Sequence, residues 1–251
     1  MSGHSKWANI KHKKGKADAK KGKIFSRIVK EITIAIKDGG STDPDYNPAL
    51  RLALNNAKGA NMPNDNVERA IKKAKDAGEN LEAHIYEGTG PEGIAVYVEC
   101  LSDNSQRTVS SVRHAFSKYN GNLGKNGSLS YLFDRKGIFT VNASEISNME
   151  DPELELIDAG LEETEKEEDK YYLTVEMADF GSMQNKLEEL KIEVENAELQ
   201  RIPKNERGVS VETALKAMKL IEFLEEDDDV QNVFHDMKMT DEIAKALEEE
   251  E

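Results

Sequence analysis

Apolar residues recur at helical spacing through the first third of the chain, which predicts amphipathic helices. The first apolar stripe begins after Ile24 and consists of Phe25, Ile28, Val29, Ile32 and Ile36. Two glycines at 39–40 end this helix. A second stripe covers residues 50–57, and a third follows Asn64, which is expected to cap its helix. The three stripes predict a small helical domain at residues 23–80.

From residue 84 the spacing changes to patterns typical of strands. The segments 84–88 and 93–100 are rich in β-branched and aromatic residues, and they flank a glycine-containing turn. A helical pattern follows at 104–119, and glycines then lead into another apolar segment at 128–133. This order predicts a β-β-α-β unit, in which a helix covers one face of a sheet.

A second module of about seventy residues is predicted after residue 136. Its strands are expected at 137–141, 171–176 and 191–202, with helices at 152–158 and 181–190. Asp151 is the expected cap of the first of these helices, ahead of Pro152, and the acidic run 163–169 separates that helix from the next strand. The module carries many carboxylates on its surface, which argues against nucleic-acid contact there.

The last fifty residues predict a helix at 211–224, a turn at 227–229, a strand from Val230 and a closing helix at 240–251. This pair lacks a sheet of its own, so we place it against the β-β-α-β unit as a four-stranded ferredoxin-like layer. The expected class is α+β, a three-helix domain followed by two α/β domains. The expected domains are a basic arm at 1–22, the helices at 23–80, a discontinuous domain at 81–136 and 205–251, and the acidic domain at 137–204.

Charge is distributed very unevenly along the 251 residues. The net charge is −15, yet residues 1–37 hold eleven lysines and arginines against two acids, while residues 145–251 hold eleven basic and thirty-four acidic residues. A positive segment on a negative body favours a polyphosphate partner. The candidate nucleic-acid-binding residues are Lys6, Trp7, Lys11, His12, Lys13, Lys14, Lys16, Lys20, Lys21, Lys23, Arg27 and Lys30.

The sequence supports two interpretations of Trp7 equally. The single tryptophan of the chain lies beside Lys6, where it could stack on an unpaired base or dock on the folded part. Residues 1–22 have few apolar anchors, so they are expected to be mobile without a partner.

The sequence supports no catalytic or metal site. Cys100 is the only cysteine, and its apolar surroundings predict a buried thiol. Residues 88–93 fit G-x-G-x-x-G, but a strand rather than a helix is expected next, so no dinucleotide site is predicted. The five histidines lack metal-ligand spacing, and the acids at 225–229 form no calcium loop. We therefore expect no enzyme activity, no cofactor, no metal and no small-molecule substrate.

Several motifs resemble those of the YebC family, which includes probable transcriptional regulatory proteins and the mitochondrial translational activator of cytochrome oxidase. They are GHSKWANIKH at 3–12, GKIF at 22–25, NMP at 61–63, ERAI at 68–71, YEG at 86–88, VECLSDN at 98–104, RT at 107–108, RHAF at 113–116, GNLG at 121–124 and VQNV at 230–233. The resemblance covers nearly the whole chain. It implies three domains, the middle one interrupted by the third, and a cytosolic, non-enzymatic regulator acting on DNA or on the ribosome.

Three classes of function remain open from the residues alone. We favour a cytoplasmic nucleic-acid-binding regulator, acting on DNA in transcription or on ribosomal RNA in translation. The chain shows no recognition helix with regularly spaced base-reading side chains, and its lysines suit phosphate contact more than base readout. A protein–protein adaptor is the second class. A membrane-surface protein is the third, and the need of the first helix for its apolar face argues against it. The sequence does not define an oligomeric state.

Overall fold

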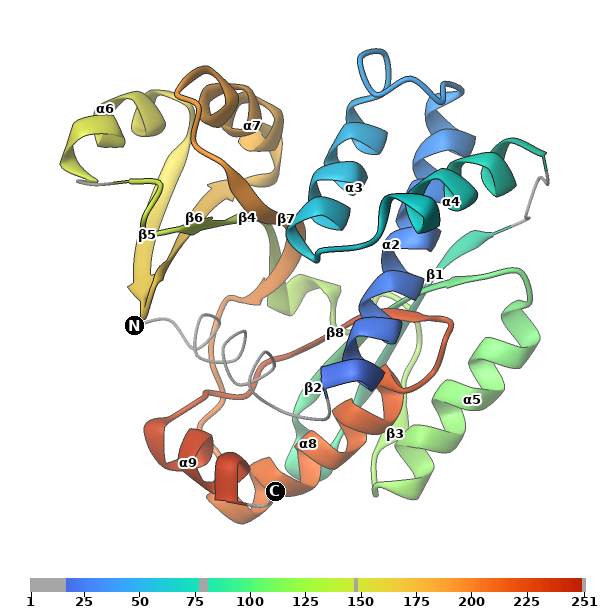
Figure 1. Ribbon diagram of the computed structural model, residues 1–251. Helices are drawn as coiled ribbons and strands as arrows, with labels where there is room; N and C mark the ends of the chain where they lie inside the picture. The colour runs from blue at the N-terminus through green and yellow to red at the C-terminus, as the bar shows by residue number, and fades with distance from the viewer. Residues whose placement is uncertain (1–16, 77–80, 147–148, 250–251) are drawn as a thin grey trace. The chain divides into compact units, whose positions relative to one another are not determined.

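The computed structural model describes residues 17–76, 81–146 and 149–249, and it has an α+β fold in which helices precede two antiparallel-type sheets (Figure 1). Contacts divide the described chain into two compact units. Of the described residues, the first unit contains 24–76, 135–146 and 149–201, and the second contains 17–23, 81–134 and 202–249. The α+β class expected from the sequence is confirmed.

The first unit begins with three helices, α2 (Ala17–Gly39), α3 (Pro48–Gly59) and α4 (Asn64–Asp76). Their buried core includes Ile28, Ile32 and Leu50, as the apolar stripes predicted. Helix α2 begins seven residues before Ile24. Helix α4 begins at Asn64 itself, and the amide of Val67 donates to the carbonyl of Pro63, so Asn64 lies inside the helix rather than capping it.

The same unit holds a sheet in the order β5-β6-β4-β7, which is formed by β4 (Phe133–Asn142), β5 (Leu161–Glu167), β6 (Lys170–Glu176) and β7 (Val194–Pro203). Helices α6 (Glu150–Asp158) and α7 (Phe180–Glu189) connect the strands, with a 3-10 turn, η3 (Met177–Asp179), before α7. This is the β-α-β-β-α-β order of a ferredoxin-like module. The sheet has a core of its own, and the half-buried Leu52 of α3 packs against it, so the helices contact the sheet at this point.

Two expectations for this sheet were wrong. The acidic run was not given a strand, yet β5 pairs along its length with β6, because an edge strand can keep its carboxylates in water while its backbone bonds to a neighbour. Helix α6 begins at Glu150, after Met149, so Asp151 lies within the helix and not at its cap.

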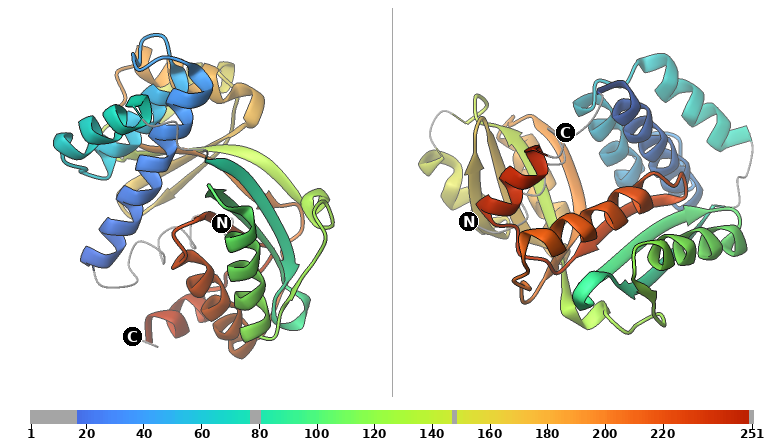
Figure 2. Two further views of the ribbon diagram at one scale, coloured as in Figure 1. Left: turned by 90° about the vertical axis from the view of Figure 1, so that its right-hand side faces the viewer. Right: turned by 90° about the horizontal axis from the view of Figure 1, so that it is seen from below.

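The second unit is built on a sheet in the order β3-β1-β2-β8 (Figure 2). Its strands are β1 (Glu82–Thr89), β2 (Ala95–Ser102), β3 (Asn122–Leu123) and β8 (Val230–His235). Every described pairing in it is antiparallel. Helices α5 (Ser105–Lys118), α8 (Val211–Glu225) and α9 (Asp241–Glu249) share one core with one face of this sheet. The third strand differs from the expectation at 128–133, where the chain forms a turn and the 3-10 helix η2 (Ser130–Leu132).

The predicted interior features of this unit are confirmed. Cys100 is buried, with a side chain only 2% exposed. The G-x-G-x-x-G segment forms the end of β1 and the short η1 (Pro91–Gly93), after which strand β2 begins. The turn at 227–229 lies directly before β8, where Asp227 accepts a hydrogen bond from the amide of Asp229 at 2.9 Å.

Candidate nucleic-acid interface

Helix α2 carries basic side chains on the face opposite its apolar stripe. Residues spaced by three or four positions lie on one side of a helix, and Lys20, Lys23, Arg27 and Lys30 have this spacing. Ile28 and Ile32, on the other side, are buried in the helical core. Lys21 is exposed, and Lys23, Arg27 and Lys30 are half-buried. The helix can therefore pack through one side and present positive charge on the other.

Two of these cations also have acidic neighbours in the folded protein. The guanidinium of Arg27 lies 3.8 Å from the carboxylate of Glu198 on β7. Burial raises the pKa of Glu31, and Arg27 opposes that rise. Arg27 therefore helps to hold α2 against carboxylates of its own unit, and its charge is shared with them.

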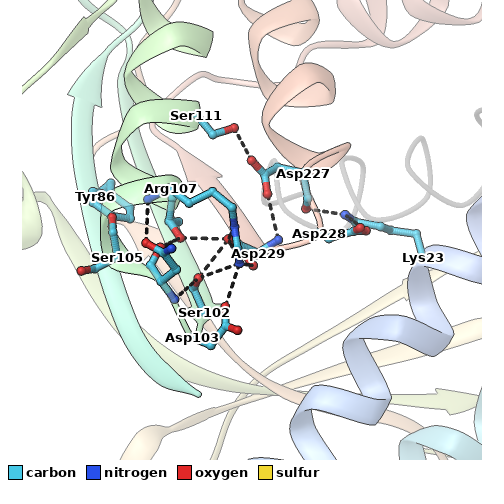
Figure 3. A network of polar contacts seen from close by, with 12 residues as sticks. Lys23, Tyr86, Ser102, Asp103, Ser105, Arg107, Ser111, Asp227, Asp228 and Asp229 are labelled. Carbon is cyan, nitrogen blue, oxygen red and sulfur yellow. Dashed lines mark hydrogen bonds and ion pairs between the residues drawn. The ribbon is translucent and has the colours of Figure 1, made fainter. Parts of the chain in front are cut away.

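Lys23 belongs to the second unit and contacts the turn before β8. Its ammonium donates a hydrogen bond to the carbonyl of Asp227 and lies 3.6 Å from the carboxylate of Asp228 (Figure 3). This ion pair is exposed on the Asp228 side, so it is weak and sensitive to salt.

The other candidates from the sequence, Lys6, Trp7, Lys11, His12, Lys13, Lys14 and Lys16, lie outside the described residues. Lys20 lies in α2, which begins at Ala17, and its backbone alone is described. The described part of the candidate interface is therefore the exposed and half-buried basic face of α2 from Lys21 to Lys30.

A second cluster of polar residues forms around Asp229, at the start of β8 (Figure 3). Asp229 is 6% exposed. Its carboxylate accepts hydrogen bonds from Nε and Nη2 of Arg107 at 3.2 and 2.9 Å, from the Ser102 hydroxyl at 3.0 Å and from the Thr108 hydroxyl at 2.9 Å. Arg107 also pairs with Asp103 at 2.9 Å. These contacts connect α5 and β2 to β8, which belongs to the C-terminal part of the chain.

The interpretation of two residues changes as a result. Arg107 is a basic residue of α5, and its charge is engaged by two carboxylates. Asp229 belongs to the acidic run at 225–229 and is nevertheless buried. The only signal in the sequence for a structural role of Asp229 is its place in the turn before a strand, because aspartate is common in turns.

The remaining cations of α5 point outward. Arg113, His114 and Lys118 are exposed, as a solvated helix face predicts. The ammonium of Lys118 lies 3.9 Å from the ring centre of Phe223 on α8, which is a cation–π contact. This contact covers part of α8 and leaves the cation partly available to solvent.

The described residues form no cluster with the arrangement that a metal ion would need. Among 17–76, 81–146 and 149–249, no three histidine, cysteine or acidic side chains converge on a common point. A cavity of about 200 Å³ lies in the first unit between Leu52 of α3 and Gln184 of α7. Its lining mixes apolar side chains with Lys58, Glu188 and Glu193, and it brings together no nucleophile and base.

Within the part of the chain that the structure describes, no helix combines the length and the apolar character needed to cross a membrane.

Comparison with known proteins gives one consistent answer across the chain. Residues 5–77 match the TACO1/YebC protein N-terminal domain, and residues 81–237 match the TACO1/YebC second and third domain. Three curated relatives bear the name probable transcriptional regulatory protein. The one from Amoebophilus asiaticus is 51% identical (94% of this chain, 98% of the relative), that from Syntrophomonas wolfei 46% (98% and 100%), and that from Chlorobaculum parvum 47% (100% and 100%).

A solved structure extends the similarity to the fold. The crystal structure of a conserved hypothetical protein from Aquifex aeolicus matches with a TM-score of 0.83 at 42% identity, covering 94% of this chain and 98% of that one. The resemblance inferred from the motifs is thereby confirmed. The chain belongs to the TACO1/YebC family, many of whose curated members are named probable transcriptional regulatory proteins.

Proposed function

We propose that this protein is a cytoplasmic nucleic-acid-binding regulator of gene expression, and that its basic N-terminal segment together with helix α2 makes the contact. The relatives' name, probable transcriptional regulatory protein, supports DNA as the first candidate partner. The proposed contact residues are those identified from the sequence between Lys6 and Lys30. We propose a non-enzymatic role, since the described residues offer binding surfaces and no reaction centre.

One observation carries this proposal, namely the separation of charge. Eleven basic residues lie in the first thirty-seven, whereas thirty-four acids lie in the last 107 residues. Coulomb attraction brings the basic segment to a phosphate backbone, and the same field repels the acidic segment from it. Helix α2 adds a folded support to this segment, because its buried stripe fixes the helix while its opposite face stays polar.

Ribosomal RNA is a second candidate partner, and the composition of α2 favours it. Between Ala17 and Gly39 the helix contains no asparagine or glutamine and one arginine, Arg27, which is already beside Glu198. Reading base edges in the major groove of DNA usually requires such side chains. A lysine-rich helix that contacts phosphates suits structured RNA at least as well, and a role in translation would follow.

A charge-matched pair of full-length variants tests the proposal. Lys11, Lys13, Lys14 and Lys16 are replaced by glutamine in the first variant. The control carries the same change at Lys191, Lys216, Lys238 and Lys245, four exposed lysines of the acidic segment. Both variants lose four positive charges, so a difference between them reflects position and not net charge.

Binding is measured by fluorescence anisotropy with duplex DNA and with ribosomal RNA fragments across a range of salt. We expect the first variant to lose affinity and to show a shallower salt dependence, by roughly 0.9 per lost phosphate contact on duplex DNA and about 0.7 on single strands. The control should bind nearly like the parent protein, or slightly more weakly, because its lost charges lie away from the proposed contact and add only to the long-range repulsion of the acidic segment. Equal behaviour of the two variants would exclude the proposed interface, and retained function in cells would then favour the protein adaptor. Crosslinking in cells followed by sequencing decides between DNA and ribosomal RNA.

A further inference from the structure

The longest stretch without an acidic residue in this chain is 104–133. One residue in five is acidic overall, 49 of 251, yet these thirty positions contain no aspartate or glutamate and four lysines or arginines. The stretch comprises α5 and the loop that follows it through β3 to η2. In a protein of net charge −15, a surface without carboxylates repels polyanions less than the rest of the molecule does, and it is better suited to binding them.

The acids that border this stretch are themselves paired with cations. Asp103 contacts Arg107 at 2.9 Å, and Asp134 contacts Lys204 at 3.4 Å. The amide of Lys204 also donates to the carbonyl of Leu132, which keeps this cation beside η2. Local negative charge near the loop is therefore partly neutralised.

A buried carboxylate fixes the shape of the loop at residues 120–131. Glu87 of β1 is 2% exposed, and its side chain accepts hydrogen bonds from the amide of Gly127 at 3.0 Å, from the amide of Leu129 and from the Ser128 hydroxyl. The amide of Gly124 donates to its backbone carbonyl at 2.7 Å. Hydrogen bonds from amides to a carboxylate are strong, so the loop is held in one conformation. Gly127 has φ +83°, which a side chain would disfavour.

The side chains that this fixed loop presents have no structural task of their own. Lys125 and Asn126 are exposed, and Tyr131 is 68% exposed. Within the described residues, none of these three side chains has a hydrogen-bond, ionic or ring partner. The loop thus presents a lysine, a side-chain amide and an exposed aromatic ring, and the buried Glu87 holds it in place. Exposed side chains of a loop held by a rigid scaffold are typical of binding sites.

We propose that the loop at residues 120–131 is a second nucleic-acid contact, which binds an unpaired stretch of the strand whose phosphates the basic N-terminal segment holds. This inference rests on the proposed function. Tyr131 stacks on an exposed base, Lys125 pairs with a phosphate, and Asn126 can donate to a base or sugar oxygen. Aromatic stacking together with a backbone cation is the usual chemistry of single-strand binding, and it accepts any base because each has a π-face.

A paired helix and a protein partner both fit this loop less well. The bases of a duplex are stacked on one another, so their faces are closed to Tyr131. A protein interface commonly has an apolar centre, whereas the apolar neighbours Leu129 and Leu132 pack inward on the cluster of Phe133, and the loop exposes mainly serine, asparagine and lysine beside Tyr131. The loop's surface is rich in hydrogen-bond donors and lacks carboxylates, which matches phosphate and base oxygens.

The test uses the full-length protein and three single variants. Tyr131→Ala removes the proposed stacking ring and Lys125→Ala removes the proposed phosphate contact. Tyr46→Ala is the matched control, because Tyr46 is 80% exposed but lies in a loop with Asp43 and Asp45. Both tyrosines are exposed, so thermal unfolding should be unchanged in all three variants. Binding is measured with labelled single-stranded RNA, single-stranded DNA of the same sequence, and duplex RNA.

We expect Tyr131→Ala to weaken single-strand binding about tenfold and duplex binding less than twofold, in line with the loss of one stacked base. Lys125→Ala should weaken it several-fold and reduce the salt slope by about 0.7. Tyr46→Ala should bind like the parent protein. A loss on both RNA and DNA indicates stacking alone, and a larger loss on RNA assigns the strand as RNA.

The outcomes separate this inference from the proposed function. If the quadruple lysine variant loses binding while Tyr131→Ala behaves like Tyr46→Ala, the loop proposal is wrong and the proposed function stands. An equal loss for Tyr131→Ala on duplex and single strands overturns the stacking role. If the parent protein binds none of the three probes but binds duplex DNA, the loop proposal is wrong and the proposed function stands. If it binds neither these probes nor duplex DNA, both proposals fail.

Discussion

The carboxylate of Asp229 receives both Nε and Nη2 of Arg107, at 3.2 and 2.9 Å, across 122 positions of the chain. Ser102 and Thr108 donate to the same carboxylate, so one buried acid joins the end of β2, the start of α5 and the start of β8. The C-terminal strand reaches this sheet only after the intervening module has been completed. Asp229 therefore helps to lock a distant segment into the second unit.

Removing either partner of this pair should destabilise the protein, and by different amounts. Asp229→Ala leaves an arginine and two hydroxyls without their acceptor in a buried site, so we expect a loss of about 3 kcal/mol in the free energy of unfolding. Arg107→Ala should cost clearly less, because the Arg107 side chain is 55% exposed and water can replace it on the carboxylate. Urea denaturation of each variant measures the difference. A larger loss for Arg107→Ala than for Asp229→Ala would contradict this account.

The hydrogen bonds of Asn56 provide a second prediction about stability. Its side chain is buried in α3, where it donates to the carbonyl of Ala197 at 3.0 Å and accepts from the amide of Ala197 at 3.0 Å. The amide thus pairs both backbone groups of one β7 residue. Asn56→Ala would leave those two groups unpaired inside the unit, and we expect a loss of about 2–3 kcal/mol.

The neighbouring Asn55 offers a matched control for this prediction. It is half-buried on the same helix and lines the cavity beside α7. Asn55→Ala removes the same chemical group without orphaning a strand residue, so the loss in unfolding free energy should stay below about 1 kcal/mol. Equal losses at the two positions, measured by urea titration, would show that the paired hydrogen bonds of Asn56 contribute little.

The sequence predicted those parts of the fold that depend on local periodicity. The stripe of α2 and the buried pattern of β2 are visible in the residue spacing, because a helix or strand must bury one side. The positive face of α2 follows from the same spacing. The contacts that depend on distant residues could not be read in this way. Asp229 and Asn56 are polar residues in ordinary patterns, and only tertiary structure decides that they are buried.

Two short strands were missed for related reasons. Strand β3 has two residues, Asn122 and Leu123, so it has no measurable alternation, and its pairing with β1 requires the close approach that Gly121 permits. Strand β5 is rich in glutamate, which has low strand propensity, and it forms because β6 supplies a partner edge. Likewise, the loop held by Glu87 needed the structure, since the sequence alone suggested a strand at its end.

Glu31 provides a prediction about the effect of pH. Burial raises the pKa of its carboxyl above the usual value, and this exceeds the opposing effects of Arg27 and of a hydrogen bond from Asn56. A carboxyl with a raised pKa in the folded state favours folding when protonated. Its contribution is complete below the unfolded pKa and is lost as pH rises through the folded pKa. Glu31→Gln should therefore be more stable than the parent protein at neutral pH.

The gain from Glu31→Gln should shrink as pH falls through the raised pKa of the folded state and be absent below the ordinary value of 4.5, because the parent residue is then neutral in both states. Urea midpoints of both proteins, recorded from about pH 4 to about pH 8, measure this difference. Glu163→Gln serves as the control, since Glu163 is exposed on β5. A pH-independent difference between Glu31→Gln and the parent would exclude ionisation as the cause.

Tyr172 predicts a second titration, at alkaline pH. Its side chain is 6% exposed, and burial together with Glu167 and Glu195 raises the pKa of its phenol to about 12. The folded protein thus favours the neutral phenol. This stabilisation is fully present below the unfolded pKa near 10 and is lost as pH rises through about 12. The stabilisation lost between these two values is on the order of 2 kcal/mol. Tyr172→Phe cannot ionise, so its unfolding free energy should fall less over this interval.

The neighbouring Tyr171→Phe is the control, and phenolate absorbance recorded during denaturation follows both ionisation and unfolding. If Tyr172→Phe and Tyr171→Phe lose stability in parallel between pH 10 and 12, the buried phenol does not account for the alkaline transition.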